Sequence, residues 1–489
     1  MEKTPAVTEA LRIIRNSLLY VTIGIIFGYW ILTLLGLPLK WTLTLAGATL
    51  LGMGIWVFKD IEKVLLVFLI LAIPLNLDIN FFIVKGHHAG MNSIIIGLVD
   101  IFLILLIAPW IVRICLKNEN KINWYPKITI PFAGMIVAAF FSAYGAKNPS
   151  LSFFEIILLF KGVLIFLYFA NRIRKESELR LILLCLTAGM VIQSIFGLLQ
   201  HYSGSSLGLG ILGESDVLLE QELRKTVSSR VGGTIGYTND LAKYLSFFFP
   251  ITISLLFSTL KRIDRFFYLS TLVLMVLAVF FTLSRVAWMG MAFSAGIVFL
   301  FQRKNKGKKI QYPLIAFLLI VLVLASQIDL IRQRFISEDT GSARSRLTTS
   351  AVAAKIILDH PLLGIGANNY QTIVAKYGDS RNPETFTMAV HNMYLLYLAE
   401  TGIIGFGIFL WLNLNLFGAL WKSAHLSSAY VQSLGIGALG AYLSLSLQGF
   451  ADFGVKHNEP RFFLFWLMMA AVVASINSAV KPNHAILNN

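Results

Sequence analysis

The chain has 489 residues, of which 57% are hydrophobic and only 13% are charged, and its mean hydropathy is +0.74. Soluble domains contain roughly 45–50% apolar and about 25% charged residues, so this composition excludes a soluble protein, and it also excludes a disordered chain. Lysine and arginine total 41 against 25 acidic residues, a net charge of +16. In a membrane protein such an excess reflects either topology or an anionic partner.

The first apolar run follows three basic residues, Lys3, Arg12 and Arg15. The run is about twenty residues long, which exceeds the core of a signal peptide, and it lacks a clear small-residue cleavage site. We therefore expect a first membrane span that is retained in the protein.

Similar runs recur along the chain. A run of about 17–25 apolar residues can cross a hydrocarbon layer of roughly 30 Å as a helix, which satisfies its own backbone polar groups. Candidate spans lie near 17–37, 41–58, 62–77, 93–116, 129–145, 153–171, 181–200, 241–260, 266–283, 286–302, 312–328, 391–420, 430–449 and 461–480. The weakest are 62–77, which Pro74 breaks, and the two runs that meet at Arg285. The sequence predicts an all-α, polytopic transmembrane helix bundle of about 12–14 spans.

Positive charges are concentrated in alternate short connections. With the N-terminus inside, the inner connections hold the basic clusters, among them 172–180, 261–265 and 303–311, whereas the outer loops 78–92 and 146–152 hold one lysine each. Because inner loops are enriched in lysine and arginine, we expect both termini in the cytoplasm. In a bacterial inner membrane, the opposite side of the bundle faces the periplasm.

Two outer segments, 201–240 and 329–390, are longer than ordinary connections, which rarely exceed about 12–15 residues. The second contains an apolar stripe at helical spacing, formed by Leu347, Ala351, Ala354 and Leu358, and Pro361 ends that helix. We predict a large helical periplasmic loop there. The chain then divides into transmembrane helices at 1–200, a periplasmic loop at 201–240, central transmembrane helices at 241–328, the large loop at 329–390 and C-terminal transmembrane helices at 391–489.

A second set of positive charges lies on the outer side, where topology does not require them: Arg224, Lys225, Arg230, Arg285, Arg332, Arg334, Arg344, Arg346, Lys355, Lys376 and Arg381. Arg285 is the sharpest case, since a cation between two apolar runs costs several kcal/mol unless it is paired or lines a wet cavity. Snorkelling to the outer headgroups is the alternative for Arg285, and surface ion pairs are the alternative for the loop arginines. Because the arginine fork matches phosphate oxygens, we predict an outer cavity that binds a lipid phosphate or pyrophosphate.

His391 opens an apolar run at its outer end, directly after the arginine-rich loop. A neutral imidazole can accept a proton from a hydroxyl, although a helix cap or structural hydrogen bond is the alternative. Glu400 is nine residues further on, roughly on the opposite helix face, so it is expected to form a buried ion pair or hydrogen bond with another helix. The charges Asp100, Glu155 and Lys161 are expected to pack helices together, with proton relay as the alternative.

Other kinds of site have no support in the sequence. The histidines, cysteines and carboxylates show no metal-ligand spacing, and the chain has no phosphate-cradling glycine loop and no nucleophile elbow. We therefore expect no metal and no cofactor. The basic residues form no continuous stripe, which argues against nucleic acid as a partner.

Four segments carry a resemblance to a known family. They are Arg230-Val-Gly-Gly-Thr-Ile-Gly-Tyr-Thr-Asn239, Ser284-Arg285-Val-Ala-Trp288, Arg346 leading into Asp359-His-Pro361-Leu-Leu-Gly364-Ile-Gly366, and His391 through Glu400 and Gly402. In this order, and in these span contexts, they resemble the O-antigen ligase and O-antigen polymerase superfamily of bacterial inner-membrane glycosyltransferases. The resemblance covers about 230–410. At Tyr237-Thr238-Asn239 the chain departs from the Asn-Pro-Asn-like turn of the family, which leaves the role of Asn239 open.

The resemblance implies transfer of a glycan from undecaprenyl diphosphate to an acceptor hydroxyl at the periplasmic face, without a metal. It implies His391 as general base and Arg230, Arg285 and Arg346 as diphosphate-binding residues, with Arg344 able to replace Arg346. The acceptor of a ligase is the lipid A core, and that of a polymerase is another lipid-linked repeat. We favour the ligase; a lipid-linked glycan transporter without chemistry is the alternative from another class.

Overall fold

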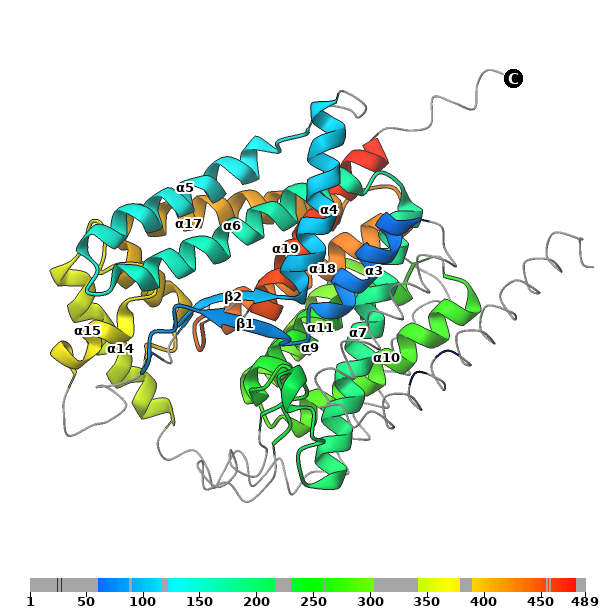
Figure 1. Cartoon of the computed structure of the whole chain (residues 1–489). Helices are drawn as coiled ribbons and strands as arrows, with labels where there is room; N and C mark the ends of the chain where they lie inside the picture. Colours follow the sequence, from blue (N-terminus) through cyan, green and yellow to red (C-terminus); the bar gives the residue numbers. More distant parts are fainter. Residues whose placement is uncertain are drawn as a thin grey trace, which may run out of the picture.

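The structure of the chain, a computed structural model, describes residues 60–87, 90–116, 122–215, 230–258, 260–302, 342–378, 389–453, 456 and 459–480, together with Gly24 and Gly28. This part of the chain is mostly helical, as the sequence predicts (Figure 1). Its strands form a single antiparallel hairpin, in which β1 (Asp78–Phe81) pairs with β2 (Ile94–Gly97).

Within the described residues, nine helices are long and apolar enough to span a membrane. They are α4 (Leu98–Cys115), α5 (Pro126–Ser142, continued by a short 3-10 turn), α6 (Pro149–Arg172), α7 (Glu176–Ser203), α10 (Arg262–Phe281), α11 (Arg285–Gln302), α17 (Met393–Ser423), α18 (Ala429–Gln448) and α19 (Glu459–Val480). Each coincides with a span expected from the sequence. The chain is a multi-pass membrane protein. The spans expected at 17–37, 41–58 and 312–328 lie outside the described residues.

The span expected at 62–77 is wrong. Helix α3 (Ile61–Ala72) has only 12 residues, about 18 Å at 1.5 Å per residue, which is short of a hydrocarbon layer of roughly 30 Å. It stops before Pro74, which lacks the N–H needed to continue a helix. The chain then enters β1 at Asp78.

Helix α9 (Thr238–Leu256) lies at the centre of the bundle and is buried along nearly its whole length. It packs against α18, α10 and α11, and also meets α19 and α7. A helix that is enclosed on all sides needs no single apolar face. This explains how α9 accommodates polar side chains in its first two turns, including Asn239 and Lys243.

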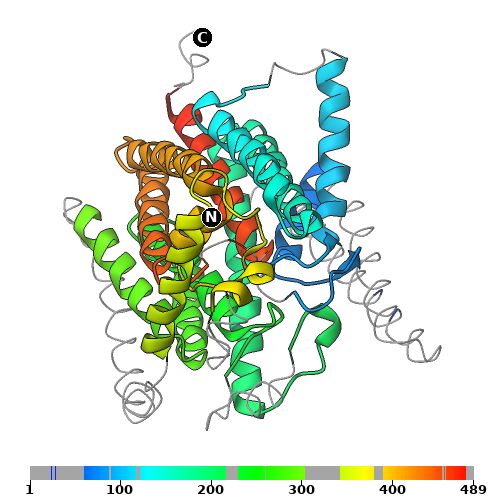
Figure 2. The same cartoon turned by 90° about the vertical axis from the view of Figure 1, so that its left-hand side faces the viewer.

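Helices α5, α6 and α17 lie side by side, and α14 (Ser342–Asp359) and α15 (Tyr370–Tyr377) sit at one end of them (Figures 1 and 2). Helix α14 ends before Pro361, as the sequence predicts. It packs through Val352, Ala353 and Ile356, whereas Leu347 and Leu358 of the predicted stripe are 75% and 79% exposed. The stripe that revealed the helix therefore faces outward.

Helix α17 is broken one third of the way along. Gly402 has φ +63° and ψ −171°, which is not helical. The loop that follows α14 fills the break with four backbone hydrogen bonds, from Ile365 N–H to the Ala399 carbonyl, Gly366 N–H to the Glu400 carbonyl, Ile403 N–H to the Pro361 carbonyl and Ile404 N–H to the Leu362 carbonyl. Irregular backbone inside a membrane protein is tolerated where other protein groups satisfy it. The 361–366 loop is thus built into α17.

Candidate active site

His391 immediately precedes α17 and is half-buried. The helix is capped by the next residue, because Asn392 Oδ1 accepts from the N–H groups of Tyr394 and Leu395, both at 3.0 Å. The His391 side chain is therefore not the helix cap. Its ring packs on that of Phe453, with 4.8 Å between the ring centroids.

Phe453 belongs to the segment between α18 and α19, which we call the 449–458 connector; residues 449–453 and 456 of it are described. Asp452 of the connector forms a buried ion pair with Lys243 of α9. Burial raises the pKa of Asp452, but Lys243 and Arg461 outweigh this effect and hold that pKa below its usual value. The connector therefore joins the His391 ring to the first turns of α9.

Arg230 also contacts these turns of α9. It is 9% exposed, its Nε donates to the Thr282 carbonyl at 2.9 Å, and its Nη2 donates to Asn239 Oδ1 at 3.1 Å. Asn239 lies one helical turn before Lys243 on α9. A continuous series of contacts therefore runs from Arg230 through α9 and the connector to His391.

Arg285 lies close to the Arg230 contact in sequence. The Thr282 carbonyl that accepts from Arg230 is three residues before Arg285, which is the first residue of α11 and is half-buried. Between them, Leu283 has φ +55°, a conformation that L residues rarely adopt. The sharp turn from α10 into α11 thus brings the start of α11 beside Arg230.

The glycine-rich loop 230–236 is held by two glutamines of α7 that sequence analysis did not select as site residues. Gln200 Oε1 accepts from the N–H groups of Gly232 and Gly233 at 3.1 and 2.8 Å, and Gln193 Oε1 accepts from Thr234 N–H at 3.2 Å. These N–H groups are occupied by side chains of the protein itself. An anion at this loop would therefore be held by arginine side chains rather than by these backbone amides.

The other predicted site residues lie elsewhere. Arg346 and Arg344 are on α14, which packs on α17; Arg346 is half-buried and its carbonyl accepts from Ser350 at 2.8 Å. The side chain of Arg344 lies outside the described part of the structure. The described contacts do not assign Arg346 to the series that joins Arg230 and His391.

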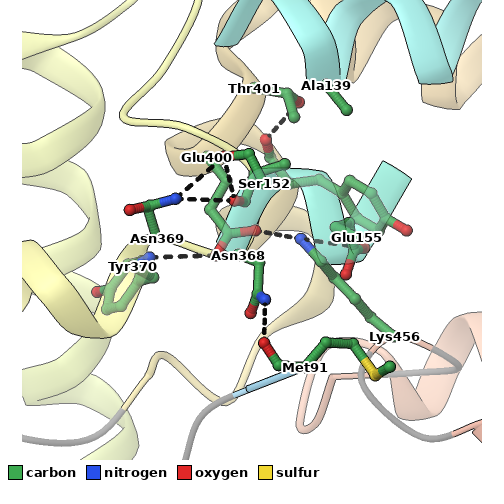
Figure 3. Close-up of polar contacts among 12 residues, drawn as sticks. Met91, Ala139, Ser152, Glu155, Asn368, Asn369, Tyr370, Glu400, Thr401 and Lys456 are labelled. Carbon is green, nitrogen blue, oxygen red and sulfur yellow. Dashed lines mark hydrogen bonds and ion pairs between the residues drawn. The ribbon is translucent and has the colours of Figure 1, made fainter. Parts of the chain in front are cut away.

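Glu400 belongs to a separate buried charge cluster next to the break in α17 (Figure 3). Lys456 of the connector pairs with the Glu400 carboxylate, lies 3.9 Å from Glu155 Oε1 of α6, and sits 4.6 Å from the centroid of the Tyr397 ring. Tyr370 N–H donates to Glu400 Oε1 at 3.3 Å. Glu400 is therefore an ion-pair residue that ties α17 to the connector and to α15.

Two cavities adjoin this cluster. A small pocket is lined by Glu155, Lys456 and Thr401, among others. An apolar pocket follows α17 from Met393 to Leu416, and its aromatic and aliphatic lining also includes Phe465 and Trp466. Tyr397 lines both cavities.

Residues 270–410 match the family model described as O-antigen ligase. This segment is similar to O-antigen ligases. The resemblance stated above is thereby confirmed, over a shorter range than 230–410. No curated protein matches the chain.

The matched segment begins within α10 and ends within α17, so it contains Arg285, α14, His391 and the break at Gly402. Arg230, α9 and the 449–458 connector lie outside it, yet they contact it at Thr282 and at His391. The family supports a membrane glycosyltransferase-type enzyme. Among the described residues, no three histidine, cysteine, aspartate or glutamate side chains are grouped as metal ligands.

Proposed function

We propose that the protein is an O-antigen ligase that transfers a glycan as a block from undecaprenyl diphosphate to a hydroxyl of the lipid A core. The reaction takes place at the periplasmic face of the bacterial inner membrane. The observation that carries the proposal is the series of contacts from Arg230 through Asn239 and α9 to the connector and His391, within and around the segment that is similar to O-antigen ligases.

The arginines bind the donor diphosphate. Arg230 is preorganised by its bonds to Thr282 and Asn239, and Arg285 begins the helix that follows Thr282. When the sugar leaves the diphosphate, negative charge develops on the phosphate oxygen, and fixed guanidinium groups stabilise it without reorganisation. Arg346, or Arg344 in its place, supplies a further cation from α14.

His391 acts as the general base. The acceptor oxygen attacks the anomeric carbon, the bond from that carbon to the phosphate oxygen breaks, the acceptor proton passes to the His391 imidazole, and undecaprenyl diphosphate leaves with the bonding electrons. A neutral imidazole has a ring nitrogen that can accept this proton. Packing on Phe453 holds the ring in one orientation.

The apolar pocket that begins at Met393 offers a contact surface for the part of the isoprenoid chain nearest the diphosphate. Met393 is two residues after His391. An isoprenoid chain there would keep the diphosphate next to the proposed base, since ligand cavities combine apolar walls with a few polar groups.

The test is incubation of the purified full-length protein with undecaprenyl-diphosphate glycan and lipid A core, followed by product mass. A ligase joins the whole glycan to the core and releases undecaprenyl diphosphate. Lengthened glycan that remains on undecaprenyl diphosphate would identify a polymerase with the same chemistry. Donor movement across vesicles with no new covalent product would identify a transporter and remove the proposal.

A further inference from the structure

In the interior of the helix bundle, the ammonium group of Lys456 lies between two carboxylates. Lys456, Glu155 and Glu400 are 2%, 3% and 1% exposed, and they come from the connector, α6 and α17 (Figure 3). Burying three charges is costly, and apolar replacements of such groups are often as stable or more stable. Stability alone is therefore a weak explanation for this arrangement.

The position of the cluster also connects it to the His391 ring. Glu400 lies at the break in α17, where its carbonyl accepts from Gly366 N–H at 3.0 Å and its carboxylate accepts from Tyr370 N–H at 3.3 Å. Lys456 N–H in turn donates to the Phe453 carbonyl at 3.2 Å. Lys456 thus contacts the break in α17 through its ammonium and the Phe453 carbonyl through its backbone N–H, and Phe453 carries the ring on which His391 packs.

We infer that Lys456 is a positioning residue for His391. Its ion pairs with Glu400 and Glu155 fix the connector, which sets the place of Phe453 and hence the orientation of the imidazole. The consequence for catalysis rests on the proposed function, because it assumes that His391 accepts the acceptor proton. The consequence for the His391 environment does not depend on any activity.

Lys161 provides a matched control. Its ammonium also lies between two carboxylates, Asp100 at 2.9 Å and Glu459 at 3.0 Å, and its side chain is only 12% exposed. It extends from the same helix as Glu155, but it holds α4 and the first turn of α19 rather than the turn that carries Phe453. Loss of Lys161 therefore removes a comparable ion cluster without releasing the His391 ring.

The first experiment measures the His391 environment in the full-length protein. Diethyl pyrocarbonate modification is followed peptide by peptide with mass spectrometry, with the exposed His425 as internal standard. We expect Lys456→Met to raise the His391 rate at least threefold relative to His425, and Lys161→Met to leave the ratio unchanged. An unchanged ratio in Lys456→Met, or an equal rise in both variants, would overturn the inference even if the protein had no transferase activity.

The second experiment measures transfer. We expect Lys456→Met to lower kcat at least tenfold with the donor KM within about twofold, Lys456→Arg to recover most of the rate, and Lys161→Met to keep kcat within threefold for the folded fraction. Equal losses in Lys456→Met and Lys161→Met would assign Lys456 a purely structural role. If the wild-type protein transfers nothing but the modification result holds, the proposed function fails and the positioning role stands.

Lys456→Met leaves two buried carboxylates without their cation and could prevent folding. The neutral triple variant Glu155→Gln, Glu400→Gln, Lys456→Met removes all three charges and avoids that problem. We expect it to melt near the wild-type temperature while the His391 modification rate stays raised and kcat stays low. If the triple variant had the wild-type His391 modification rate and the wild-type kcat, Lys456 would only compensate charge, and the inference would be overturned.

Discussion

Asp452 binds Lys243 across a buried contact between the 449–458 connector and α9, and the next residue, Phe453, packs on the His391 ring. The Asp452–Lys243 pair thus connects the helix that carries Asn239 to the entrance of α17. Asn239 also receives a hydrogen bond from Arg230. A shift of Asp452 would therefore change the positions of both Arg230 and His391.

The first prediction concerns the proposed base. We expect His391→Ala to abolish transfer, because no group would then accept the acceptor proton, while membrane insertion and donor binding stay largely intact. The measurement is the initial transfer rate together with donor binding to purified protein. His425→Ala is the control and should behave as wild type. Full activity in His391→Ala would remove the assignment of the base.

The second prediction concerns donor binding by Arg285. We expect Arg285→Ala to weaken donor binding or turnover at least tenfold, because a charge-assisted contact to phosphate contributes about 1.5–3 kcal/mol. Arg180, whose guanidinium lies 4.1 Å from the Tyr430 ring centroid and pairs with Glu176, serves as control. If Arg180→Ala and Arg285→Ala gave equal effects, Arg285 would have no special role at the diphosphate.

The third prediction concerns pH. Because the pKa of Asp452 is held below its unfolded value by Lys243 and Arg461, its contribution to stability is present at neutral pH and is lost as pH falls through the folded pKa. Asp452→Asn removes one partner of a buried pair and should cost about 3–5 kcal/mol at pH 7. The melting temperatures of the two proteins should begin to approach each other near pH 4, the ordinary pKa of an aspartate, and should converge only below the lowered folded pKa, where the wild-type carboxyl is also neutral.

The comparison in the third prediction is made as a series of thermal melts between pH 7 and pH 3. Lys63→Ala, which breaks the exposed pair with Asp60 at 2.7 Å, is the control and should shift the melting temperature little at any pH. A gap between wild type and Asp452→Asn that stays constant with pH would contradict the role given to this carboxylate.

The fourth prediction concerns the break in α17. A Cβ at Gly402 would lie 2.2 Å from the Leu362 carbonyl oxygen, and φ there is +63°. We expect Gly402→Ala to yield little folded protein. Gly407 lies on the same helix with open space around its Cβ position, so Gly407→Ala should be tolerated and could gain about 0.5–1 kcal/mol. Recovery of both variants at wild-type yield would show that the loop adapts to the added methyl group.

Hydropathy predicted the described spans well, because crossing a lipid layer imposes the same requirement of length and apolarity on each of them. It could not show the break at Gly402, since glycine is common in membrane helices and the groups that fill the break lie about forty residues earlier at 361–366. The predicted span at 62–77 failed for a related reason. Most of its last residues are apolar, but Pro74 prevents the helix from continuing through them and β1 begins directly after them.

The candidate site was predicted only in part. Charge and position in the sequence selected Arg230, Arg285 and His391. The same signal, a charged residue between two apolar runs, is present at Asp452 and Lys456, but these two residues were not selected. Their importance depends on partners far away in sequence, Lys243 and Glu400 among them. Gln193 and Gln200 gave no sequence signal, because a buried glutamine in a span is recognisable only from the loop it holds.

The burial of α9 has a consequence for how the protein is made. Asp240 and Lys243 are within its first two turns, and each would cost at least about 2.5 kcal/mol in lipid without a partner. Their partners, Arg461 and Asp452, are synthesised more than two hundred residues later, which is roughly 10–40 s at 5–20 residues per second. Helix α9 therefore reaches its final surroundings only when the last spans have emerged, and truncation before Arg461 would leave the centre of the bundle unfinished.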